Sequence, residues 1–230
     1  MRSVILAGGK GRRLQPFTTT IPKPLFPLGE KPILQIIIEQ LKTYGINDFV
    51  ISLGYLGGLI EAFFGDGSKF NCNIEYVIEN EPLGTAGAIS LLPEMGEDFL
   101  FMNGDILTTL DFNKAIQFHK QNSNLMTICS FKKKMKSSLG ILEIGNDNEV
   151  VNYHEKPENE FLVSSGIYIL NPLIKNFVNA NEKIDLPQLV LRLIENKKRV
   201  KSFLIEGDWF DIGTPGDLEL ALKYFERENK

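Results

Sequence analysis

The chain has 230 residues, of which 43% are hydrophobic and 23% charged, and its net charge is −4. This composition is typical of a globular protein that is long enough to bury a core. The slight excess of acidic residues argues against a nucleic-acid-binding surface, and no apolar run is long enough to span a membrane. Cys72 and Cys129 are too few for a disulfide framework, so we expect a cytoplasmic protein with reduced thiols.

Short apolar runs alternate with amphipathic segments along the first half of the chain. Periodicity and stop signals predict, in order, a strand at 4–7, a helix at 33–44, a strand at 49–53, a helix at 59–64, a strand at 74–78, a helix at 85–92 and a strand at 99–102. Strands separated by single helices form parallel β-α-β units. We therefore predict an α/β fold with a doubly wound, mostly parallel, Rossmann-like sheet, whose ligands lie beyond the carboxyl ends of the strands.

The second half of the chain has a more mixed pattern. It predicts strands at 125–131, 140–144, 166–170 and 201–205, a turn at 146–148, and helices at 186–195 and 214–228. The lysine-rich segment 132–136 is predicted to be a solvated loop. Because no low-complexity linker interrupts the chain, we interpret residues 1–230 as one domain with two halves, about 1–110 and about 111–230.

A glycine-rich turn follows the first predicted strand. The turn holds three glycines and an arginine: Gly8, Gly9, Gly11 and Arg13. Glycine lets backbone N–H groups approach an anion closely, so the segment predicts a polyphosphate site. The turn is not the dinucleotide fingerprint, because Leu14 occupies the position of the third glycine, and the chain has no Walker sequence.

The turn is part of a longer pattern, L-A-G-G-x-G-x-R-L-x-P-x-T over residues 6–18, which continues with P-K-P-L at 22–25 and K-P at 31–32. This pattern resembles the signature of the sugar-1-phosphate nucleotidyltransferases, which join an NTP to a sugar 1-phosphate and release pyrophosphate. The resemblance implies that Arg13 and Lys23 are the catalytic cations that act on the phosphates. It also implies that the turn binds the nucleotide through Leu6, Ala7, Gly8, Gly9, Gly11 and Arg13.

Two aspartates are candidates for a metal site. Asp105 follows a predicted strand within N-G-D, and Asp211 lies in W-F-D-I-G-T. Carboxylates suit Mg²⁺, a hard cation that orients phosphate oxygens in phosphoryl transfer. The two positions are far apart in the sequence, and the resemblance implies that Asp105 and Asp211 hold Mg²⁺ together, with Asp105 also contacting the nucleotide.

The segment E-N-E-P-L-G-T-A-G-A at 79–88 resembles the part of the family that recognises the base. The resemblance assigns Glu79, Pro82, Gly84 and Thr85 to nucleotide binding, and the helix predicted from residue 85 would offer free N–H donors. Guanine presents two adjacent donors that the Glu79 carboxylate can accept, whereas thymidylyltransferases of the family carry glutamine at this position. GTP is therefore favoured, with UTP and CTP left open.

The sugar side is implied by shorter matches in the second half of the chain. The residues assigned to the sugar phosphate are Gly140, Glu155, Lys156 and Ser164. Ser164 departs from the asparagine of mannose-specific relatives. Because the chain ends directly after the last predicted helix, we expect a short family member, similar to the mannose- or heptose-1-phosphate guanylyltransferases. The expected substrate is a manno-configured hexose or heptose 1-phosphate, bound by the half from about 111 to 230 as a sugar-binding lobe, while the half from about 1 to 110 binds the nucleotide.

Two other functions are compatible with the sequence. One is a uridylyl- or cytidylyltransferase that acts on another sugar phosphate. The other, more remote, is a non-catalytic regulatory subunit that binds nucleotide-sugars, but such proteins lose the loop arginine or the metal aspartates, which are all present in this chain. The expected partners are an NTP and a sugar 1-phosphate, with no nucleic acid and no membrane, and the sequence leaves a homo-oligomer open.

Overall fold

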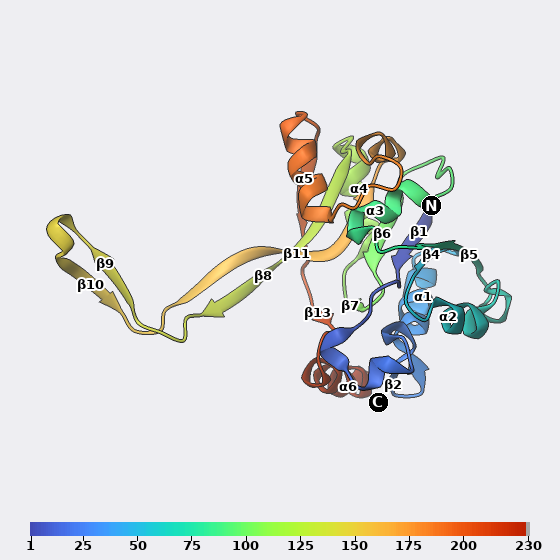
Figure 1. Ribbon diagram of the computed structural model, residues 1–230, viewed down its shortest axis with the longest axis horizontal. Coiled ribbons are helices and arrows are strands. Elements are labelled where there is room, and N and C mark those ends of the chain that lie inside the picture. The colour runs from blue at the N-terminus through green and yellow to red at the C-terminus, as the bar shows by residue number, and fades with distance from the viewer. Residues whose placement is uncertain (229–230) are drawn as a thin grey trace.

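The computed structural model describes residues 1–228, and a seven-stranded sheet in the order β12-β8-β11-β6-β1-β4-β5 lies at its centre (Figure 1). β1 pairs in parallel with β4 and β6, β4 with β5, and β12 with β8, whereas β11 runs antiparallel to both of its neighbours. The predicted doubly wound, mostly parallel sheet is confirmed. Its strands are β1 (Arg2–Leu6), β4 (Asp48–Leu53), β5 (Asn73–Ile78), β6 (Phe99–Asn103), β8 (Met126–Lys136), β11 (Glu158–Leu170) and β12 (Val200–Leu204).

Both faces of the sheet are buried. Ile5 and Ile51 pack in one hydrophobic cluster with α1, and the next residues back, Val4 and Val50, pack in a second cluster with α5. Side chains that alternate between two buried faces explain why these strands read as continuous apolar runs. The helices are α1 (Ile33–Thr43), α2 (Gly57–Phe64), α3 (Gly84–Gly87), α4 (Phe112–Gln121), α5 (Leu186–Glu195) and α6 (Pro215–Glu228). Within residues 1–228, none of the helices is long and apolar enough to cross a membrane.

Short antiparallel pairs bring distant segments together beside the main sheet. β7 (Ile106–Thr108) pairs with β13 (Trp209–Asp211), with Asp211 opposite Ile106. This pairing places Asp211 next to the residue that follows Asp105. The other short pairs are β2 (Pro27–Leu28) with β3 (Lys31–Pro32), and β9 (Ile141–Ile144) with β10 (Val150–His154).

Strands β8 and β11 extend far beyond the lengths that the sequence predicts. They pair from Met126 and Leu170 in the body out to Lys136 and Glu158, and the β9–β10 hairpin follows at the far end. Figure 1 shows this ribbon projecting from the body, and we call residues 131–163 the arm. The prediction of a loop at 132–136 is wrong, because its backbone pairs with 158–162, although its side chains are exposed. The strand partner is remote in sequence, so the local lysine-rich pattern gave no sign of it.

The helix predicted at 85–92 also differs from the structure. α3 makes a single turn, and a 3₁₀ turn (Ala88–Leu91) follows it. Gly84 and Gly87, the first and last residues of α3, weaken a regular helix. In addition, the N–H groups of Ala86 and Gly87 both donate to the carbonyl of Ile184, at 3.0 Å each, so the remote segment 179–185 shapes this turn.

Glu182 anchors the segment 179–185 against α5. Its carboxylate accepts hydrogen bonds from the Arg192 guanidinium at 2.9 and 2.5 Å and from the Asn179 backbone N–H at 2.9 Å. These hydrogen bonds, with that of Arg192 the largest, lower the pKa of Glu182 from its ordinary 4.5 to about 2. Because the pKa is lower in the folded protein, the ion pair contributes stability above pH 4.5 that is lost as the pH falls towards 2.

Replacing Glu182 by Gln removes the pH dependence of folding stability that comes from this ion pair. We expect Glu182→Gln to be less stable than wild type at pH 6, with a difference that shrinks between pH 4.5 and 2. Urea unfolding midpoints measured across this range test the expectation. Glu206→Gln, at an exposed glutamate, should follow the wild-type curve. A Glu182→Gln difference that is constant with pH would contradict the role of the ion pair.

Candidate functional site

The glycine-rich turn lies where β1 ends, in contact with the end of β4. The Ala7 N–H donates to the Ser52 carbonyl at 2.8 Å, and the Tyr55 N–H donates to the Gly8 carbonyl at 3.2 Å. A Cβ on Gly54 would stand only 2.8 Å from the Gly8 carbonyl oxygen. The two backbones therefore touch at this crossing, which leaves no room for a side chain at Gly54.

The backbone conformation and the close surroundings of Gly11 both require glycine at this position of the turn. Its φ is +57°, and a Cβ there would stand 2.7 Å from Thr18 Cγ2, while the Thr18 hydroxyl donates to the Gly11 carbonyl at 3.0 Å. The 3₁₀ turn Arg12–Leu14 follows. Arg13 then lies flat against Gly213, where a Cβ would stand 2.8 Å from Arg13 Nη1, and Arg13 Nη2 is 3.8 Å from Asp211 Oδ2.

Lys23 lies between the two predicted metal aspartates. Its Nζ donates to Asp105 Oδ2 and is 3.8 Å from Asp211 Oδ1, and its side chain is 9% exposed. The β7–β13 pairing supports this arrangement, because the Ile212 N–H donates to the Asp105 carbonyl at 3.0 Å. The structure thus places Lys23 beside both aspartates that the resemblance assigned to one metal site.

The two carboxylates fit a divalent cation. Asp105 Oδ1 is buried and has no hydrogen-bond partner in the described part of the chain. Burial and the nearby Asp105 charge raise the pKa of Asp211, and Lys23 and Arg13 counteract this only in part. Residues 1–228 contain no cluster of three or more His, Cys, Asp or Glu side chains, so the protein would supply these two carboxylates, and substrate oxygens and water the remaining ligands.

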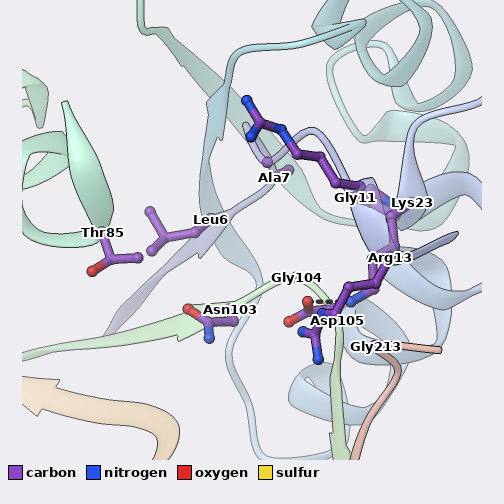
Figure 2. A pocket seen from close by; sticks show the side chains of 13 residues that line it. Leu6, Ala7, Gly11, Arg13, Lys23, Thr85, Asn103, Gly104, Asp105 and Gly213 are labelled. Atoms are coloured by element: carbon purple, nitrogen blue, oxygen red, sulfur yellow. Dashed lines mark hydrogen bonds and ion pairs between the residues drawn. The ribbon is translucent and has the colours of Figure 1, made fainter. Parts of the chain in front are cut away.

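These side chains border a cavity of about 340 Å³, the first cavity, at the carboxyl ends of β1 and β6. Figure 2 shows Arg13 and Lys23 beside Asp105, with Thr85 on the opposite side near Leu6. The position confirms that the candidate site lies beyond the ends of parallel strands. The lining residues are Leu6, Ala7, Gly9, Gly11, Arg12, Arg13, Lys23, Pro24, Thr85, Asn103, Gly104, Asp105 and Gly213.

A second cavity of about 720 Å³ shares the glycine-rich turn with the first and contains Glu79. Glu79 Oε1 accepts a hydrogen bond from the Ser52 hydroxyl at 2.7 Å, and Oε2 accepts one from the Leu83 N–H at 3.1 Å. A carboxylate has about four acceptor positions, so Glu79 can hold this loop and still accept from a ligand. Its lining residues are Gly8, Gly9, Lys10, Gly11, Arg12, Gly54, Tyr55, Glu79, Asn80, Pro82 and Lys183.

The backbone donors at the start of α3 are used within the protein. The Thr85 N–H donates to Asp185 Oδ1 at 2.9 Å, and the Leu186 N–H donates to the Thr85 hydroxyl at 2.9 Å. Gly84 has a φ of +80°, and a Cβ there would stand 2.6 Å from the Ile184 carbonyl oxygen. The expectation of free N–H donors at this helix is therefore wrong, although Thr85 does line the first cavity.

The residues predicted for the sugar phosphate lie apart from both cavities. Gly140, Glu155 and Lys156 lie on the arm, and Ser164 adjoins its base, where its hydroxyl is 2.8 Å from that of Tyr168. The Glu155 carboxylate accepts from the Tyr153 hydroxyl at 2.8 Å. None of these four residues lines the first or the second cavity, so their role in binding sugar phosphate stays a prediction.

Several lining residues were not assigned from the sequence. Asn103 and Gly213 lie within the two aspartate motifs, N-G-D and W-F-D-I-G-T, in which only the aspartates were assigned a role. Gly54 and Lys183 carried no such signal, because strand pairing and the segment 179–185 bring them to the site. The unassigned residues are Lys10, Arg12, Pro24, Gly54, Tyr55, Asn80, Asn103, Gly104, Lys183 and Gly213.

Known proteins share this sequence pattern. The profile of the family described as "Nucleotidyl transferase" matches residues 2–228. A mannose-1-phosphate guanyltransferase from Yarrowia lipolytica is 34% identical, over 94% of this chain and 62% of its own length. A UTP–glucose-1-phosphate uridylyltransferase from Synechocystis is 28% identical, over 97% of this chain and 63% of its own length.

A solved structure shares the fold. HddC from Yersinia pseudotuberculosis, complexed with GMP-PN, superposes with a TM-score of 0.75 and 30% identity, over 97% of this chain and 99% of that one. The chain thus spans under two thirds of the length of the Yarrowia and Synechocystis relatives and nearly all of HddC. Since the family profile covers almost every residue, the chain belongs to the nucleotidyl transferase family.

Proposed function

We propose that the protein forms an NDP-sugar and pyrophosphate from an NTP and a sugar 1-phosphate. The first cavity carries this proposal, because Arg13 and Lys23 meet Asp105 and Asp211 there, beside a turn of exposed glycine backbone. Cations and backbone donors suit the phosphates of the nucleotide, and the two carboxylates suit the divalent cation that such substrates carry. The names of the Yarrowia and Synechocystis relatives support the same reaction class.

The proposed chemistry is a direct displacement at the α-phosphorus. An ionised oxygen of the sugar phosphate attacks the α-phosphorus, the bond from that phosphorus to the oxygen bridging to the β-phosphate breaks, and pyrophosphate leaves. No general base is needed, because the attacking oxygen is ionised at neutral pH. Mg²⁺, when held by Asp105 and Asp211, would neutralise and orient phosphate oxygens.

In this proposal, most of the rate enhancement comes from the positioning of the two substrates by the protein. Lys23 is nearly buried and fixed between two aspartates, so its ammonium does not have to be reoriented during the reaction. Arg13 is held against Gly213 and can bind two phosphate oxygens at once through its planar guanidinium. Two anionic reactants brought together in this way avoid much of the entropy cost of their encounter.

GTP is the favoured nucleotide in this proposal, with a manno-configured hexose or heptose 1-phosphate as its partner. Glu79 lies in the second cavity with acceptor positions to spare for adjacent guanine donors. The guanyltransferase from Yarrowia and the GMP-PN complex of HddC support guanine. Uridylyl transfer is the second candidate, because the Synechocystis uridylyltransferase aligns over 97% of this chain.

Replacing Asp105 by Asn tests the proposed metal site. We expect Asp105→Asn to lose about 100-fold or more in kcat, measured by pyrophosphate release, because one charged oxygen facing the phosphates is lost. Binding of Mn²⁺ in the presence of nucleotide, followed by electron paramagnetic resonance, should weaken in parallel. Asp208→Asn, the same change at an exposed aspartate in the segment preceding Asp211, should leave both measurements near wild type. Unchanged Mn²⁺ binding in Asp105→Asn would overturn its assignment as a ligand.

Replacing Glu79 by Gln tests base recognition. We expect kcat/KM for GTP to fall by about 10- to 100-fold relative to UTP, since a pair of hydrogen bonds to the base discriminates by about 1–3 kcal/mol. Ser52→Ala is the matched control, because it removes a bond to Glu79 but keeps the carboxylate. It should lower both activities together and leave their ratio unchanged. An unaltered ratio in Glu79→Gln would remove Glu79 from base selection.

A further inference from the structure

The arm exposes an unusual amount of apolar surface. Ten of the twenty large hydrophobic side chains that are exposed in the described chain lie between residues 135 and 162. A two-stranded ribbon has no core of its own and is marginally stable in water unless something covers it. The ten are Met135, Leu139, Ile141, Leu142, Ile144, Val150, Val151, Tyr153, Phe161 and Leu162, each between 42% and 72% exposed.

The paired part of the arm has two different faces. Because cross-strand neighbours share a face, the register puts the pairs 131–163, 133–161 and 135–159 on one side and 132–162, 134–160 and 136–158 on the other. The first side is mostly apolar, with Phe131, Val163, Phe161 and Met135. The second side is mostly charged, with Leu162 as its one apolar residue, and Lys132 and Glu160 form an ion pair on it at 2.9 Å. The ribbon is therefore amphipathic, and on its first side Met135 and Phe161 are not covered by any part of residues 1–228.

The apolar face begins at the candidate site. Phe131 stacks on Trp209 with ring centroids 4.2 Å apart, and Trp209 lies two residues before Asp211 on β13. From there the paired ribbon runs outward over six cross-strand pairs to Lys136 and Glu158, a distance of roughly 17–20 Å. Lys156 lies just beyond that outer end. If the arm of a second copy packed antiparallel on this face, the outer end of that arm would therefore lie at Trp209 of this copy.

The first cavity lacks the groups that lie on the arm. Its lining comes from residues 6–105 and Gly213, and no residue of its own arm takes part. The strand pairing of β8 and β11 holds Glu155 and Lys156 at the far end of the ribbon. The cavity therefore contains its nucleotide-side cations but none of the residues assigned to the second substrate.

We propose that two copies of the chain pack their arms antiparallel, apolar face on apolar face, and that Glu155 and Lys156 of each copy complete the first cavity of the other. The symmetry axis passes near Phe161, the middle of the apolar face, so that the outer end of each arm meets the base of the other. Lys133 lies on the same face, opposite Phe161, and its long side chain can extend past the contact. The role of Glu155 and Lys156 in this arrangement rests on the proposed function.

The place of the exposed apolar side chains along the arm favours a second copy as the occupant. Met135 and Phe161 lie on the apolar face of the paired ribbon, seven others lie beyond it between residues 139 and 153, and Leu162 lies on the charged face. Exposed apolar patches of this kind mark protein–protein contacts. One two-fold contact covers the apolar faces of both arms and brings the arm residues to both first cavities.

The arm contact is tested first, without reference to activity. Wild type should sediment as a dimer at micromolar concentration, and Phe161→Asp should sediment as a monomer, whereas Leu191→Asp, at an exposed leucine on α5, should remain a dimer. Phe161→Cys should be joined to a second chain by a short bismaleimide, whose reach matches the ~10 Å spacing of packed sheets. Leu162→Cys, one residue away on the opposite face, should not be joined. The natural cysteines are both buried. A monomeric wild type, or equal joining of the two cysteine variants, would overturn the proposal.

Shared sites are tested by combining two inactive chains. Mixed dimers of Asp105→Asn and Lys156→Ala, purified through two different tags, should regain about half of the wild-type rate of pyrophosphate release, because one of their two sites draws an intact cavity from one chain and an intact arm from the other. Mixed dimers without activity would overturn sharing between copies. Full activity of Lys156→Ala alone would refute the role of Lys156 and this inference, but would leave nucleotidyl transfer standing. Absence of activity in wild type would refute the proposed function, while sedimentation and cysteine joining still decide the arm contact.

Discussion

The position of Lys23 between Asp105 and Asp211 is the contact on which the candidate site depends. A lysine that is nearly buried is stable only with opposite charges beside it, and carboxylates brought this close repel each other unless a cation stands between them. Lys23 begins a 3₁₀ turn (Lys23–Leu25), Asp105 follows β6, and Asp211 ends the short strand β13. Their mutual attraction therefore requires the two halves of the chain to meet at this point, and Arg13 and Gly213 take their places around it.

Much of the body could be predicted from the sequence because the determinants are local. The apolar runs of β1, β4 and β6 alternate with helices, and that order alone predicts a parallel sheet with a site at its carboxyl edge. The turn after β1 needs glycine for a steric reason that is visible at Gly11, where a side chain would collide with Thr18. The meeting of Asp105 with Asp211 was implied by resemblance, and in the structure both lie beside Lys23.

What the sequence did not reveal depends on pairing between remote segments. The outer half of β8 is a run of lysines with no alternating pattern, and it is a strand only because residues 158–162 lie beside it. The turn after Gly84 takes its shape from the remote Ile184 carbonyl, which accepts hydrogen bonds from the N–H groups of Ala86 and Gly87. Lys183 entered the second cavity for the same reason. In each case the deciding partner lies far away in the chain, beyond the reach of local periodicity.

Asp185 links the start of α3 to the start of α5. Its carboxylate accepts from the Thr85 N–H and also closes the capping box of α5, whose other half is the bond from the Asp185 N–H to the Gln188 side chain. One side chain thus accepts hydrogen bonds at the N-termini of both helices, which pack on the same face of the sheet. If the loop that contains Glu79 and Gly84 widened, α5 would have to move with it, or the hydrogen bonds of Asp185 at the two helix N-termini would break. The shape of the second cavity is consequently coupled to the packing of Leu189 and Leu193 in the second core, which line neither cavity.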